Sequence, residues 1–342
     1  MRIVVDINHP GHVHMFKNFI WEMQKRGHEI LITATEKDVA FKLLDNYGFD
    51  YINLGSYGKL LIEKLVNIPV IDLKMYYKVK SFNPDVFIGV GSIRAAHVSF
   101  LLRKKCIIFE DTEHSTEQIK LYLPFVSAVC TPSCFKGELG KKQIRYNGYH
   151  ELAYLHPNNF KPDPEVLHEL GLNESDPYVV MRFVSWEASH DIGQHGINNK
   201  KDLVKMLEKY GKVFITSEGK LDPELEKYKL KISPEKLHDL LYYATLYVGE
   251  GATTASECSV LGTHAIYVNT LRLGYTDEEE EKYDLVYNFS NETHVEKKVF
   301  EKAVNLLSNP NLKPEGKLKR EKLINDKIDV TNFMVQFIER YK

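Results

Sequence analysis

Residues 1–35 read MRIVVDINHPGHVHMFKNFIWEMQKRGHEILITAT, and this stretch decides the fold. The apolar residues 3–5 predict a buried strand, and residues 8–12 predict a turn. The helix that follows has apolar residues every three to four positions and ends at Gly27. Residues 29–33 predict a second strand. Because two strands joined by a helix run parallel, we expect a parallel sheet covered by helices.

The same alternation of strands and helices continues through most of the chain. Further strands are expected at residues 51–53, 86–90, 106–109, 128–130, 178–181, 212–216, 246–248 and 264–268. Further helices are expected at residues 38–45, 92–102, 200–209, 234–244 and 254–261. Residues 156–164 are rich in proline and asparagine, which is typical of a linker.

We therefore predict an α/β protein with two Rossmann-like, doubly wound domains that face a cleft. The N-terminal domain is expected to cover residues 1–156, and the C-terminal domain residues 165–316. Residues 317–342 are charged and amphipathic and predict a C-terminal helix, which could pack back on the N-terminal domain. Ligands of such sheets bind at the carboxyl ends of the strands.

The composition excludes several classes of protein. With 45 Lys and Arg against 47 Asp and Glu, the net charge is −2, so no long-range attraction to nucleic acid is expected. The four cysteines form no CxxC pair, which is typical of reduced thiols. No apolar run approaches the roughly 20 residues that span a bilayer. We expect a cytoplasmic protein.

Residues 247–262, YVGEGATTASECSVLG, are the strongest functional signal. A strand ends at Val248, small residues follow, and a helix begins near Thr253 or Thr254. The N–H groups at a helix N-terminus bind phosphate groups well. Glu257 lies one turn into the helix and could accept hydrogen bonds from sugar hydroxyls. The alternative is a capping box between Thr254 and Glu257, which needs no ligand.

Residues 249–262 resemble the nucleotide-binding segment of GT-B enzymes, especially UDP-N-acetylglucosamine 2-epimerase and the N-acetylglucosaminyltransferase of peptidoglycan synthesis. Residues 10–13 resemble the transferase's turn after its first strand. Residues 107–111 resemble the epimerase segment that holds a catalytic glutamate, and residues 147–149 resemble the segment that closes the first domain in both families. The whole chain is identified as a member of the domain-of-unknown-function 354 family, placed in the GT-B superfamily.

The resemblance implies roles for individual residues. It places four residues near the diphosphate: Gly251, Ala252, Thr253 and Thr254. It also places Glu257 on the ribose, and it matches Glu110 and His190 to the epimerase's acid–base residues. Ser92 stands where the epimerase has a catalytic aspartate, so we expect glycosyl transfer rather than epimerisation.

Glycosyl transfer needs a base for the acceptor hydroxyl. His12, next to Gly11 at the start of the first helix, is one candidate, and Glu110 or Asp111 is the other. Acidic residues that merely begin a helix are the alternative for Glu110 and Asp111. Polar residues near strand ends are further candidates for substrate contact: Gly11, Ser92, Arg94, Arg182 and Ser217. For Arg182, a structural salt bridge is the alternative to a diphosphate contact.

We expect neither a metal nor a cofactor, because His9, His12 and His14 do not have the spacing of metal ligands. Residues 58–70 predict an amphipathic core helix, with a membrane-facing loop as the alternative.

The functional hypothesis is transfer of a sugar from a nucleotide-sugar, UDP-linked, to an unidentified acceptor in glycan or cell-surface polysaccharide synthesis. The alternatives are a UDP-N-acetylglucosamine 2-epimerase-like enzyme and a catalytically inactive nucleotide-sugar-binding protein. No oligomeric state is predicted.

Overall fold

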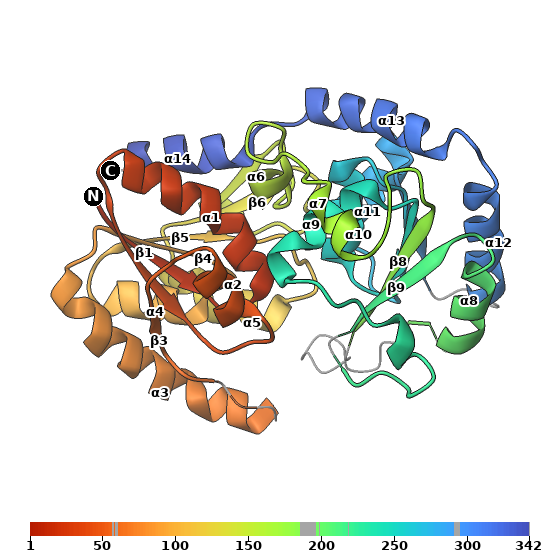
Figure 1. Cartoon of the computed structure of the whole chain (residues 1–342). Helices are drawn as coiled ribbons and strands as arrows, with labels where there is room; N and C mark the ends of the chain where they lie inside the picture. Colours follow the sequence, from red (N-terminus) through yellow and green to blue (C-terminus); the bar gives the residue numbers. More distant parts are fainter. Residues whose placement is uncertain are drawn as a thin grey trace. The chain divides into compact units, whose positions relative to one another are not determined.

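The chain divides into two compact units in the computed structural model. The first unit comprises Met1–Tyr154 and Ile328–Lys342, and the second comprises Leu155–Lys327 (Figure 1). The structure describes every residue except 57, 59, 60, 185–195, 198, 218, 291–294 and 342, and it describes no side chains for residues 61–65.

The first unit is built on a seven-stranded sheet whose neighbouring strands are all parallel. Its strands, in sheet order, are β3 (Tyr51–Asn53), β2 (Glu29–Ala34), β1 (Arg2–Ile7), β4 (Val86–Val90), β5 (Lys105–Phe109), β6 (Ala128–Pro132) and β7 (Gln143–Tyr146). The central strands are buried nearly throughout, which explains why their sequences are almost continuous apolar runs.

Helices follow most of these strands. They are α1 (Pro10–Lys25), α2 (Ala40–Asn46), α3 (Leu61–Val79), α4 (Ile93–Leu101), α5 (Thr116–Tyr122) and α14 (Val330–Arg340), and the short α6 (Leu152–Leu155) lies at the unit boundary. In α1, Pro10 occupies the first turn, and His9 caps the helix by accepting a hydrogen bond from the N–H of Gly11. The predicted strand–helix–strand pattern of residues 1–35 is therefore present.

The helix predicted for residues 58–70 extends further than expected. It is α3, and it continues to Val79. Ile71, Met75 and Val79 are buried in the core of the first unit, as an amphipathic core helix requires. Among the residues that the structure describes, no helix is long and apolar enough to cross a membrane.

The second unit is built on a five-stranded parallel sheet. Its strands, in sheet order, are β12 (Val286–Phe289), β11 (Ala265–Val268), β10 (Leu246–Gly249), β8 (Tyr178–Phe183) and β9 (Lys212–Ser217). Its helices are α7 (Glu165–Glu169), α8 (Lys200–Leu207), α9 (Leu237–Tyr243), α10 (Ala252–Leu261), α11 (Gly274–Tyr283), α12 (Val295–Leu307) and α13 (Leu312–Asp326). Both units therefore have the predicted parallel α/β architecture.

The C-terminal segment differs from the single helix expected for residues 317–342. It forms two helices, α13 and α14, which belong to different units. The break between them is fixed because the N–H of Ile328 bonds to the carbonyl of Asn147, and Asp329 then caps α14 by accepting from the N–H of Asn332. Helix α14 lies beside α1 (Figure 1).

Candidate functional site

Asp6, at the end of β1, is the centre of a buried polar network in the first unit. Its carboxylate accepts hydrogen bonds from Thr33 Oγ1 and Arg94 Nε at 2.7 Å each and from Ser92 Oγ. Arg94 also donates to the hydroxyl of Thr35 at 3.0 Å and to the carbonyl of Ile7 at 2.8 Å. The network joins the ends of β1 and β2 to the start of α4.

This network argues against the substrate contacts expected for Ser92 and Arg94. Both residues are fully buried, and Ser92 also caps α4 by accepting from the N–H of Ala95 at 3.1 Å. A guanidinium committed to a buried carboxylate would leave that charge unpaired if it moved to a ligand. We therefore assign both residues a structural role at the ends of the strands.

His12 lies in the first turn of α1, one residue after the half-buried Gly11. Its Nδ1 is buried and has no hydrogen-bond partner among the described residues. Burial lowers the pKa of His12 well below its ordinary value, and the nearby His9, His150 and Arg94 act in the same direction. His12 is therefore a neutral imidazole at pH 7, which is the form that can accept a proton.

Glu110 follows β5 directly and is buried. Its carboxyl accepts hydrogen bonds from the N–H of Thr112 and from Tyr122 Oη, both at 3.0 Å. Burial raises the pKa of Glu110 to about 7, and the neighbouring Asp111 adds to the shift. Gly91, in the left-handed region at φ +50°, leaves room for this carboxyl, because a Cβ there would lie 3.2 Å from Glu110 Oε2.

Asp111 forms a close pair with His150, a residue that the sequence interpretation did not single out. Oδ2 of Asp111 lies 2.9 Å from Nδ1 of His150, and Thr112 Oγ1 donates to Oδ1 at 3.0 Å. Burial alone would raise the pKa of Asp111, but its interactions with His150 outweigh burial and hold that pKa below its ordinary value. Asp111 therefore stays ionised and fixes the orientation of the imidazole.

His12, Glu110, Asp111, Tyr146 and His150 form a cluster in the first unit. It is unusual because some of its buried polar atoms lack partners among the described residues. Among the described residues, Nε2 of His150 and the hydroxyl of Tyr146 have no hydrogen bond, as is true of Nδ1 of His12. The rings of Tyr146 and His150 are stacked, with centroids 6.5 Å apart. Buried polar atoms without partners are costly, so a group of them suggests a functional site. The cluster can accept and donate protons.

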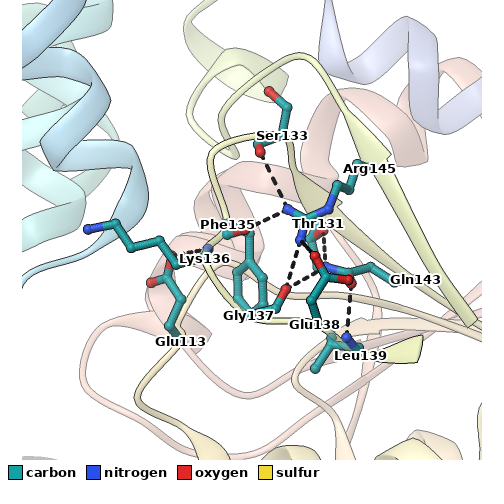
Figure 2. Close-up of polar contacts among 10 residues, drawn as sticks. All are labelled: Glu113, Thr131, Ser133, Phe135, Lys136, Gly137, Glu138, Leu139, Gln143 and Arg145. Carbon is teal, nitrogen blue, oxygen red and sulfur yellow. Dashed lines mark hydrogen bonds and ion pairs between the residues drawn. The ribbon is translucent and has the colours of Figure 1, made fainter.

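Polar contacts hold the loop that follows β6 (Figure 2). Arg145, on β7, donates to the carbonyls of Phe135 at 2.5 Å and Gly137 at 2.8 Å, and to the carboxylate of Glu138 at 2.8 Å. The N–H of Lys136 donates to Oε1 of Glu113, three residues after Glu110, at 3.1 Å. The loop is thereby tied to the segment that carries Glu110 and Asp111.

In the second unit, α10 begins two residues after β10. Its N-cap is Gly251, no side chain among the described residues caps the helix, and its first turn contains no acidic residue. The first intrahelical bond to the cap is from the N–H of Ala255, so the N–H groups of Ala252, Thr253 and Thr254 have no intrahelical acceptor. Thr253 is exposed. This helix start is suited to an anionic group.

The half-buried Arg182, on β8, lies against the same turn. A Cβ at Gly251 would lie 3.2 Å from Arg182 Cδ, and a Cβ at Gly249 would lie 2.9 Å from the carbonyl oxygen of Arg182. Glycine is therefore needed where the strand and helix approach each other. The arrangement places a cation next to the start of α10.

The capping box considered for Thr254 and Glu257 is wrong. Gly251 takes the cap position, and Glu257 Oε1 lies 2.9 Å from Nε2 of His238 on α9, with both side chains buried. The role of Glu257 in binding ribose remains a prediction, with His238 as the residue that holds its carboxylate.

Glu250 has a structural role that the sequence did not suggest. Its buried carboxylate accepts hydrogen bonds from the N–H groups of Val184 and Ile197, both at 2.9 Å, and from Lys200 Nζ at 3.3 Å. It thus joins the chain after β8 to the start of α8, beside the turn that leads into α10.

The remaining predicted residues lie elsewhere. Ser217 ends β9, two strands from β10, and its hydroxyl donates to the carbonyl of Gly219 at 3.0 Å. His190 lies outside the described residues. In the part of the chain that the structure describes, no group of three or more His, Cys, Asp or Glu could hold a metal ion.

The structure thus brings the predicted residues together in two places. His12 and Glu110 share the neighbours Asp111 and His150 in the first unit. Gly251–Thr254, Glu257 and Arg182 lie around the start of α10 in the second. His150 could have been found from the sequence, because it directly follows the segment 147–149 that the resemblance singled out.

Residues 1–337 match the family model described as a protein of unknown function, DUF354, and the chain belongs to this family. An uncharacterised protein of Methanocaldococcus jannaschii is 27% identical over 275 residues, which are 75% of this chain and 79% of that protein. A UDP-N-acetylglucosamine–N-acetylmuramyl-(pentapeptide) pyrophosphoryl-undecaprenol N-acetylglucosamine transferase of Desulfotalea psychrophila is 25% identical over 126 residues, which are 33% of this chain and 34% of that enzyme.

Solved structures share the fold over the whole length. A Listeria monocytogenes protein proposed to be a UDP-N-acetylglucosamine 2-epimerase has a TM-score of 0.70 at 11% identity, covering 100% of this chain and 96% of that one. A spinosyn rhamnosyltransferase in complex with spinosyn aglycone has a TM-score of 0.62 at 12% identity, and the match covers 99% of this chain and 100% of that one. The chain therefore has the GT-B fold.

Proposed function

We propose that this member of the DUF354 family transfers a sugar from a UDP-linked donor to an acceptor hydroxyl, in the synthesis of a glycan or cell-surface polysaccharide. The observation that carries the proposal is the start of α10, where no described side chain caps the helix and Arg182 lies alongside. The names of the Desulfotalea and Listeria proteins both specify UDP-N-acetylglucosamine, which supports UDP as the nucleotide.

The second unit would hold the donor. The N–H groups of Ala252, Thr253 and Thr254, which have no intrahelical acceptor, and the cation of Arg182 would bind the diphosphate. Glu257, held by His238, would accept hydrogen bonds from the ribose. These groups would also stabilise the charge that develops on the diphosphate as it leaves the sugar.

The first unit would supply proton transfer. The acceptor oxygen forms a bond to the anomeric carbon while the bond from that carbon to the diphosphate oxygen breaks, and the electron pair leaves with the diphosphate. His150 takes the acceptor's proton on Nε2 while Asp111 holds Nδ1–H, as in other carboxylate–histidine pairs. The neutral His12 and the protonated form of Glu110 would orient the acceptor.

Epimerisation is less well supported by the same site. It requires a proton to move at a carbon atom, for which the resemblance places an aspartate at the position of Ser92. Ser92 is buried and already bonded to Asp6 and to the N–H of Ala95. We therefore favour transfer over epimerisation.

Calorimetric titration of the full chain with UDP, and with GDP and CMP for comparison, tests the donor site. Thr253→Asp places a negative charge at the exposed start of α10, where it stabilises the helix but repels a diphosphate. We expect affinity for UDP to fall by about tenfold or more without a loss of thermal stability. Thr253→Asn is the matched neutral control and should retain UDP binding.

Two results would overturn the donor site: no binding of any nucleotide, or equal affinity in the wild type and Thr253→Asp. Release of UDP from UDP-N-acetylglucosamine, measured with and without cell-envelope extract, then tests for transfer. Binding of UDP without any turnover would instead identify a binding protein.

A further inference from the structure

Helix α3 carries an exposed apolar stripe that the proposed function does not use. Val66, Val70, Leu73 and Tyr77 follow one another at spacings of four, three and four residues, so they lie on one face of the helix. Their exposed fractions lie between 54% and 62%. An exposed Val or Leu is ordinary by itself, but a continuous row is not.

The core of the first unit does not explain this stripe. The residues of α3 that pack into that core are Ile71, Met75 and Val79, which are buried on the opposite side of the helix from the stripe. Helix α3 is therefore apolar on two faces, and only one of them is covered by the described residues.

Helix α4, the neighbour of α3, also carries exposed apolar residues. It packs against α3 (Figure 1), and His97 Nδ1 on α4 lies 2.7 Å from Asp72 Oδ2 on α3. At the end of α4, Phe100 and Leu101 are also exposed. We define the α3–α4 patch as the six exposed apolar residues Val66, Val70, Leu73, Tyr77, Phe100 and Leu101.

Between positions 66 and 82, the charged residues on α3 and just after it are mostly basic. Lys74, Lys78 and Lys80 are exposed, and the Nζ atom of Lys80 lies 4.7 Å from the centre of the Tyr77 ring. Asp72 is the only acidic residue between positions 66 and 82, and it is paired with His97. An apolar stripe with lysines along its flank is typical of a helix that lies in a membrane interface.

We propose that the α3–α4 patch docks on the surface of an anionic phospholipid membrane. The apolar side chains would enter the boundary between headgroups and acyl chains, and the lysines would contact the phosphates. A second copy of this chain fits the patch less well, because it would bring the two sets of lysines together without an acidic partner. This inference goes beyond the proposed function and does not depend on it.

Co-sedimentation of the full chain with vesicles tests the proposal. We expect binding to phosphatidylglycerol–phosphatidylcholine vesicles, weaker binding to phosphatidylcholine alone, and a loss of binding as salt is raised. Leu73→Glu should lower the vesicle partition about tenfold or more, because it replaces an apolar group that would enter the membrane by a charge. Lys78→Glu should lower it about fivefold or more.

Matched controls lie on the second unit. Leu318, on α13, is 66% exposed, and Lys297, on α12, is also exposed, so Leu318→Glu and Lys297→Glu make the same chemical changes away from the patch. Both controls should bind vesicles as the wild type does. Failure to bind anionic vesicles, or equal losses in the controls, would overturn the proposal. So would a dimer in solution that Leu73→Glu dissociates, without any vesicle binding.

Discussion

Oδ2 of Asp111 lies 2.9 Å from Nδ1 of His150, and Nε2 of the same ring has no partner among the described residues. The first unit contains a second pair of the same kind, in which Asp72 Oδ2 lies 2.7 Å from Nδ1 of His97. There Nε2 is 3.1 Å from the carbonyl oxygen of Leu121. Of these two rings, only that of His150 has a nitrogen without a partner among the described residues. The Asp111–His150 pair is therefore suited to proton transfer, and the Asp72–His97 pair to a structural role.

The two pairs predict different effects on turnover. Once sugar transfer is measured, His150→Gln should lower kcat by a factor of about 10² to 10⁴, the usual contribution of a general base, and change KM much less. Asp111→Asn should lower kcat and alter the pH profile of kcat/KM, because it removes the charge that orients His150. Asp72→Asn is the control and should leave kcat unchanged. An unchanged kcat in His150→Gln would remove this residue from the mechanism.

Glu110 predicts a pH dependence of stability. Its pKa is raised from 4.5 to about 7, so the folded protein binds more protons than the unfolded chain between these pH values. The free energy of unfolding that this group contributes is present below pH 4.5 and lost as pH rises to about 7, a change of about 3 kcal/mol. Glu110→Gln should therefore gain stability relative to the wild type between pH 4.5 and pH 8.

Urea unfolding at pH 5 and pH 8 measures this difference. Glu117→Gln, at a site whose side chain is 84% exposed, is the control and should show no comparable gain. If the difference between Glu110→Gln and the wild type were the same at both pH values, the carboxyl would not titrate in this range.

The buried pair of Asp6 and Arg94 predicts a loss of stability without loss of nucleotide binding. Arg94→Met leaves the Asp6 carboxylate buried without its cation and should cost about 3–5 kcal/mol. Asp6→Asn combined with Arg94→Met should cost less than the sum of the single changes, because neither charge then remains alone. Urea unfolding measures both effects. If Arg94→Met were as stable as the wild type but had lost turnover, Arg94 would again be a candidate for substrate contact.

Much of the fold could be predicted because parallel strands that are buried on both faces must be apolar. The strands at residues 51–53 and 86–90 lie where they were expected. Strand β7, QIRY, was missed because it lies at the edge of its sheet, where polar residues are tolerated. Charge alone would place the acidic run at 278–281 on the surface, but it lies within α11, and Glu279 is buried with Ser256 donating to it.

The site could be predicted only in part. The turn at Gly251 could be recognised because its signal is local: glycine and small residues stand next to one another between a predicted strand and a predicted helix. The partners of Glu257 and Asp111 were not, since His238 and His150 lie far from them in the sequence and meet them only through tertiary packing.

Helix α14 connects to His150 through a row of ring contacts. The ring of Phe333 on α14 stacks on Tyr146 at 5.0 Å, and Tyr146 stacks in turn on His150. A Cβ at Gly148 would lie 2.7 Å from Val330 Cγ2, so the helix is in close contact with the segment before His150. During synthesis on the ribosome, these contacts can form only after residues 155–327 have been made. The first unit can therefore be completed only after the second has been synthesised.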